Sequence, residues 1–200
     1  MNAFEMDTVA LTNMRLGTDD NTRTEYAPIL LIGYNVANRE IARRVIHPTI
    51  WESVALGEND RVDVSGLSMT VAQIVAVAEF EDYTADSGGM QGRRLAFSYV
   101  DNDTIAVIGA DGLTTVFVKY EYVPDDLVRP LATSATGATS PPAWVPVQYH
   151  MAYVYRGMSE VYAADDDKNS AAFAQNKYED ELNHIPTLDR QTEIATAYFL

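Results

Sequence analysis

Apolar residues recur at helical spacing in the first quarter of the chain. A short helix is predicted from about Met6 to Leu16, because Gly17 and the polar residues after it end the pattern. A second helix is predicted from near Thr24 to about Ile46, with Pro28 in its first turn, where proline is tolerated. Its apolar positions are three or four residues apart and form one stripe: Leu30, Tyr34, Ala37, Ile41 and Val45.

Between residues 50 and 123 the pattern changes to the alternation that is typical of strands. The clearest strand runs from Thr114 to Val123, and Asp101-Asn102-Asp103 is a good hairpin turn. One face of that strand is apolar and consists of Val116, Val118, Tyr120 and Tyr122. The pattern predicts an antiparallel sheet of five or six short strands, and the flanking helices are the expected cover for its apolar face.

A long connection rich in proline, serine, threonine and alanine spans residues 124–146. A connection of this length is usually functional or mobile. Two further helices follow, joined by a short acidic turn, and they predict an αα-hairpin. The first carries an apolar stripe of Val147, Met151, Val154, Met158 and Val161. The second runs from about Lys168 to His184, with Ala171, Ala174, Tyr178, Leu182 and Ile185 as its apolar positions.

These elements predict an α+β protein with a helical body and an inserted antiparallel β-subdomain. The N-terminal helix pair, residues 1–49, and the C-terminal αα-hairpin, residues 124–186, form the body. The insertion spans residues 50–123, and residues 187–200 form a C-terminal tail rather than a domain.

Composition excludes several classes of protein. The 200 residues carry a net charge of −15, so the overall field does not attract nucleic acid or an anionic membrane. There is no cysteine, which excludes disulfides, thiolate catalysis and zinc sites that need cysteine. No apolar run is long enough to span a bilayer, and the acidic start predicts no signal peptide.

Catalytic and ligand-binding motifs gain no support from the sequence. His47, His150 and His184 lie far apart in the sequence, and there is no HExxH pattern. The acidic run starting at Asp165 imitates a calcium loop but lacks its glycine and its final glutamate. The glycine-rich stretch 87–92 lacks the GK[ST] ending of a phosphate loop, and no GxSxG elbow is present. We therefore expect no catalytic residue, cofactor or metal.

Aromatic residues are the most distinctive feature. Trp144, Tyr149, Tyr153 and Tyr155 crowd the entrance and faces of one predicted helix, which indicates a surface that packs on a partner. Tyrosines half-buried within one subunit would explain the same pattern. At the chain end, Tyr198, Phe199 and Leu200 are predicted to dock in a neighbouring subunit or the portal; the alternative is that they fold back on their own helical hairpin. In the turn Asp165-Asp166-Asp167, we expect Asp167 or a neighbour to cap the last helix.

The order of these segments resembles the head-to-tail connector, or adaptor, proteins of tailed bacteriophages. Three segments carry the resemblance. They are the N-terminal helix pair with Asn35-Val36-Ala37-Asn38-Arg39-Glu40-Ile41-Ala42, the strand 116–122 followed by Val123-Pro124-Asp125-Asp126-Leu127, and the hairpin that begins at Trp144-Val145-Pro146 and closes with Tyr178-Glu179-Asp180-Glu181-Leu182. The segment 127–142 and the tail after Pro186 depart from the family pattern.

The resemblance implies a non-enzymatic structural protein of the virion neck, made in the host cytoplasm. Its partners would be further copies in a ring, usually of twelve, together with the portal protein and a tail or nozzle protein. DNA would pass through the lumen without specific binding, and acidic side chains there would repel its phosphates. Two alternatives stay open: another neck or tail-completion component, and an acidic carbohydrate-binding or hydrolytic β-domain.

Overall fold

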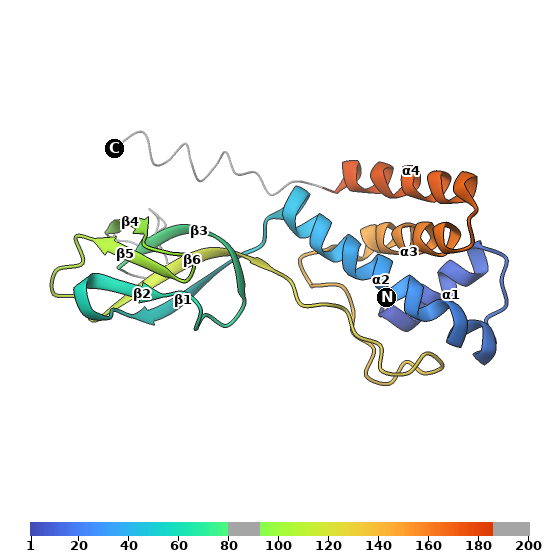
Figure 1. Ribbon diagram of the computed structural model, residues 1–200, viewed down its shortest axis with the longest axis horizontal. Helices are drawn as coiled ribbons and strands as arrows, with labels where there is room; N and C mark the ends of the chain where they lie inside the picture. Colours follow the sequence, from blue (N-terminus) through green and yellow to red (C-terminus); the bar gives the residue numbers. More distant parts are fainter. Residues whose placement is uncertain (80–92, 186–200) are drawn as a thin grey trace. The chain divides into compact units, whose positions relative to one another are not determined.

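The computed structural model describes residues 1–79 and 93–185, and Figure 1 shows the arrangement of their elements. These residues form a mixed α+β structure with four α-helices and a six-stranded antiparallel sheet, which confirms the predicted fold class. The chain falls into two compact units. The helical unit comprises Met1–His47 and the chain from Pro124 onward, and the sheet unit comprises Pro48–Val123.

The elements of the helical unit are α1 (Ala3–Asn13), α2 (Asp20–Ile41), a π-helical turn (Ala42–Ile46), a 3-10 turn (Val147–Tyr149), α3 (His150–Ala164) and α4 (Lys168–His184). Helix α2 begins four residues before the position predicted from its apolar stripe. The reason is a cap: the Asp19 carboxylate accepts hydrogen bonds from the backbone N–H groups of Asn21 and Thr22, at 3.1 and 3.2 Å. Pro28 consequently lies inside the helix rather than in its first turn.

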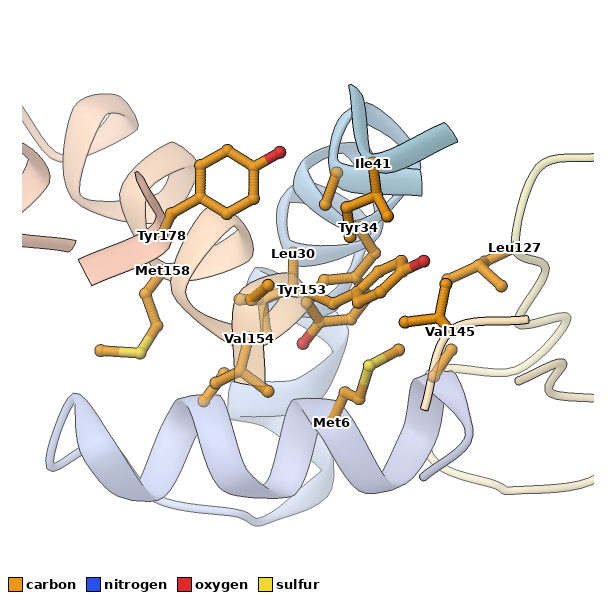
Figure 2. Packing of buried hydrophobic residues seen from close by; sticks show 14 of the residues in the cluster. Met6, Leu30, Tyr34, Ile41, Leu127, Val145, Tyr153, Val154, Met158 and Tyr178 are labelled. Carbon is orange, nitrogen blue, oxygen red and sulfur yellow. The ribbon is translucent and has the colours of Figure 1, made fainter. Parts of the chain in front are cut away.

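Helix α3 is the centre of the helical unit and packs against α1, α2 and α4. The predicted stripe of α2 is buried as expected, and Figure 2 shows Leu30 and Tyr34 among side chains of α1 and α3. Helices α2 and α3 come unusually close where Gly33 of α2 faces Gly157 of α3. A Cβ atom on Gly33 would lie 2.6 Å from the Cα of Gly157, so only glycine fits at this crossing.

The strands of the sheet unit are β1 (Thr49–Ala55), β2 (Arg61–Asp63), β3 (Thr70–Ala78), β4 (Arg94–Tyr99), β5 (Thr104–Ile108) and β6 (Thr115–Val123), and a 3-10 turn (Glu58–Asp60) precedes β2. Their order in the sheet is β1-β6-β3-β4-β5-β2. The predicted apolar face of β6 is buried at Val116, Val118 and Tyr120, and it packs on side chains from β2, β3, β4 and β5. The sheet thus supplies its own apolar core, whereas the sequence pattern predicted helices as the cover.

Glu52 of β1 ties this edge strand to the loop after β2. Its carboxylate accepts hydrogen bonds from the backbone N–H of Ser68 at 3.0 Å, from the Ser68 hydroxyl at 2.8 Å and from the Tyr120 hydroxyl at 2.8 Å. Although partial burial raises the pKa of Glu52, these three hydrogen bonds lower it below its usual value. The carboxylate therefore joins β1, β6 and the loop in its ionised form.

Candidate interaction surface

The long connection after β6 is held along the helical unit by polar groups of α2. We call residues 124–146 the strap. Asn35 accepts a hydrogen bond from the Leu127 N–H at 2.6 Å and donates one to the Leu127 carbonyl at 3.2 Å. Asn38 donates to the Asp125 carbonyl at 2.9 Å. The Asn35 side chain therefore provides hydrogen-bond partners for both the backbone N–H and the backbone C=O of Leu127, as a neighbouring strand would in a sheet.

A second group of contacts joins the strap to α1. Arg129 is buried and forms an ion pair with the fully buried Asp7. Burial raises the pKa of Asp7 to about 6, although the guanidinium groups of Arg129 and Arg23 lower it. The backbone N–H of Ala3 also bonds the Thr139 carbonyl at 2.8 Å. The Asp7–Arg129 pair is shielded from solvent, and its position fits a structural role.

The four aromatic residues of the predicted surface are divided between the core and the surface of the helical unit. Tyr153 lies in the core: it is fully buried, and its hydroxyl donates a hydrogen bond to Oδ1 of Asn38 at 3.0 Å. Burial raises the pKa of Tyr153. The assignment of Tyr153 as an assembly contact is therefore wrong, because its side chain is enclosed by its own subunit. Trp144, Tyr149 and Tyr155 are half-buried and pack on the same core while part of each remains at the surface.

The acidic turn between α3 and α4 has the structure that the sequence predicted. The carboxylate of Asp167 caps α4 by accepting a hydrogen bond from the Ser170 N–H at 3.1 Å. The interaction with Ser170 lowers the pKa of Asp167. Asp165 and Asp166 are exposed, and Asp166 lies 3.5 Å from the Lys168 ammonium.

Large apolar side chains are exposed at four separate places on the helical unit. They are Ile32 of α2 at 59%, Val128 and Leu131 of the strap at 52% and 56%, Val147 before α3 at 69%, and Phe173 of α4 at 60%. The sequence placed Val147 on the inward stripe of a longer helix. It is exposed because α3 begins only at His150, so Val147 does not follow the spacing of that helix.

The exposed Phe173 could have been found from the sequence, because it lies outside the Ala174–Tyr178 stripe. Ile32 likewise falls off the stripe of α2. No periodic pattern identifies Val128 or Leu131, which lie in a strap without regular secondary structure.

The histidine and acidic side chains of the described residues were compared with the geometry of a metal centre. No group of three or more His, Asp or Glu side chains within 1–79 and 93–185 is placed to hold a metal ion. His150 is buried and its Nε2 lies 3.3 Å from the Val145 carbonyl, whereas His184 is exposed and contacts the carbonyl of Asp180. Of the helices in the same part of the chain, none is long and apolar enough for a transmembrane span.

The structure therefore defines an α+β protein with large apolar side chains exposed at separate places on its helical unit. Protein-family models give no match to the chain, and no curated protein matches it significantly. The predicted contacts Tyr198, Phe199 and Leu200, and the glycine-rich stretch 87–92, lie outside the described residues.

Proposed function

We propose that the chain is a non-enzymatic subunit of an adaptor ring in the neck of a tailed bacteriophage, between the portal and the tail. The observation that carries this proposal is the distribution of exposed apolar side chains over the strap, the entrance of α3 and α4. A subunit of a ring contacts its two neighbours through two different surfaces, because such contacts are heterologous. It also contacts the assemblies above and below the ring, so it needs apolar groups on several sides.

Two further features support the same proposal. The net charge of −15 gives a ring a strongly acidic character, and acidic groups lining a lumen would let DNA pass without adhering. Asn35, Asn38 and Arg39, which belong to the segment that resembles adaptor proteins, hold the strap to α2. These contacts give the three residues an architectural role, which is the kind of role that the adaptor resemblance implies.

The experiment is an attachment assay. The purified chain is added to DNA-filled heads that carry the portal, and the heads are imaged by electron microscopy and weighed by native mass spectrometry. We expect a ring of added density at the portal vertex. Val147→Ser and Phe173→Ser should weaken attachment or ring formation without loss of fold, since both side chains are exposed. Asn176→Ser, on the exposed side of α4, is the matched control. A folded chain that never binds the portal vertex would contradict the proposal.

The tail prediction is tested in the same assay, although residues 186–200 lie outside the described part of the chain. A chain truncated after Arg190 lacks Tyr198, Phe199 and Leu200. If these residues anchor the subunit in an assembly, the truncated protein stays folded and soluble but fails to attach. Normal attachment of the truncated protein would show that the tail is no anchor.

A further inference from the structure

The outward face of α2 carries a row of side chains that ends in opposite charges. The row consists of Glu25, Ile29, Ile32 and Val36 of α2 and Arg43 of the π-helical turn that continues α2, at spacings of four, three, four and seven. Glu25 and Arg43 are exposed, Ile32 is 59% exposed, and Ile29 and Val36 are half-buried. The buried stripe of α2 points the other way, toward α3.

The two ends of this row carry charges that remain available. Arg39 pairs with Asp126 at 2.7 Å and Arg44 pairs with Glu179 at 3.0 Å. Within residues 1–79 and 93–185, neither Glu25 nor Arg43 forms an ion pair. They cannot pair with each other, because eighteen residues of helix separate them by about 27 Å.

The side chains of the row complement those of the same row in a second copy whose helix runs in the opposite direction. Its centre is at residue 34. Ile32 and Val36 lie two residues on either side of that centre, which is about 3 Å along the axis, and Glu25 and Arg43 lie nine residues away, which is about 13 Å. A second α2 lying antiparallel would therefore bring an isoleucine opposite a valine and a carboxylate opposite a guanidinium, twice each.

We propose that two copies of the free chain associate through this face, with their α2 helices antiparallel about a two-fold axis. Ile32 packs against Val36 of the partner subunit, and Glu25 faces Arg43 of the partner subunit. Such a contact closes on itself and cannot extend into a ring, so it is separate from the contacts of the proposed adaptor ring. A single helix pair buries little area, and the dimer is accordingly weak and dependent on concentration.

Charge reversal tests both the contact and its direction. Sedimentation equilibrium of the full chain measures the dimer, and we expect more dimer at low salt than at high salt. Glu25→Arg alone or Arg43→Glu alone replaces two attractions by two repulsions, which should raise the dissociation constant about tenfold or more. The double variant restores both pairs. A mixture of the two single variants should form a mixed dimer, because each chain then meets opposite charges on its partner. The direction is tested by the single and double variants, since a parallel pair would place like charges together in the unmodified chain, in each single variant and in the double variant alike.

Controls separate this contact from general effects of charge. Lys177→Glu and Asp180→Arg change exposed charges of α4 and should leave the dimer unchanged. Ile32→Ser should weaken the dimer without loss of helix content, since the side chain is mostly exposed. A chain that stays monomeric at every concentration would overturn the proposal. So would a dimer that ignores the charge reversals, or single variants that do not form the mixed dimer. Portal attachment by a chain that fails here would leave the adaptor proposal standing.

Discussion

Replacing Gly33 by alanine should separate the two central helices of the helical unit. The new Cβ would lie 2.6 Å from the Cα of Gly157 and 2.8 Å from its backbone nitrogen. Carbon atoms in contact require about 3.5 to 4 Å, so α2 and α3 must move apart by roughly 1 Å at their crossing. The atoms that oppose the methyl group belong to backbone, and a change of rotamer cannot relieve the overlap.

The net effect is the difference of two opposing terms. Overpacking of a well-packed core costs about 1–3 kcal/mol, and a clash with backbone belongs at the upper end of that range. Alanine regains about 1 kcal/mol over glycine in a helix. We therefore expect Gly33→Ala to lower the free energy of unfolding by about 2 kcal/mol. Gly157→Ala meets a side chain instead, 2.5 Å from Cε1 of Tyr34, and should cost less if that ring can shift.

Urea unfolding followed by circular dichroism at 222 nm measures the change, because the signal reports mainly on the helices. With a denaturant slope of about 2 kcal/mol/M, the midpoint should fall by about 1 M. Gly66→Ala is the matched control, since its Cβ would meet nothing within 4 Å. The double variant of Gly33 and Gly157 should cost less than the sum of the two single variants, because one separation relieves both overlaps. An unchanged midpoint for Gly33→Ala would refute the reasoning.

Three further predictions concern polar groups of the helical unit. Asn35→Ala removes both hydrogen bonds to the backbone of Leu127 and should lower the free energy of unfolding in urea by about 2–3 kcal/mol. Residues 124–146 should then be cleaved faster by proteases. An unchanged free energy and cleavage rate would mean that other contacts hold the strap. Changing Asp165, Asp166 and Asp167 together to asparagine should alter the free energy of unfolding by less than about 0.5 kcal/mol, because asparagine caps a helix about as well as aspartate. Asp167→Ala alone should lower it by about 1 kcal/mol, because the cap is lost. Equal losses in the two variants would exclude capping as the role of Asp167. Burial, followed by the charge of the nearby Met1 amino group, lowers the pKa of His150, so the unfolded chain binds the proton more readily than the folded one. The free energy of unfolding should therefore fall as the pH drops below about 6.5. His150→Gln should reduce that fall between pH 7.5 and 5.5, and an identical fall in the variant would disprove the link.

Periodic patterns predicted the elements well, because burial on one side imposes a period on a helix or strand. The stripe from Leu30 to Val45 and the apolar face of β6 are both buried as the sequence indicated. The strap could not be predicted in this way. Its packing depends on Asn35 and on the Asp7–Arg129 pair, whose partners are 92 and 122 residues apart in the sequence. Burial of Tyr153 was likewise missed, because α3 packs on three helices and buries more than one face.

Helix α2 explains how a long insertion can interrupt the helical unit. Three sides of this helix differ: the apolar stripe packs on α3, the asparagine row binds the strap, and the outward row is the face that we propose for the dimer contact. The chain leaves the π-helical turn that follows α2 at His47, whose left-handed backbone (φ 49°) ends the turn before Pro48. It returns at Pro124, and the next residue is bound at once by Asn38. One end of the insertion thus continues from α2 through the π-helical turn, and the other end is held to α2 by Asn38. Binding of the returning chain is a physical reason for the Asn-x-x-Asn-Arg segment of α2.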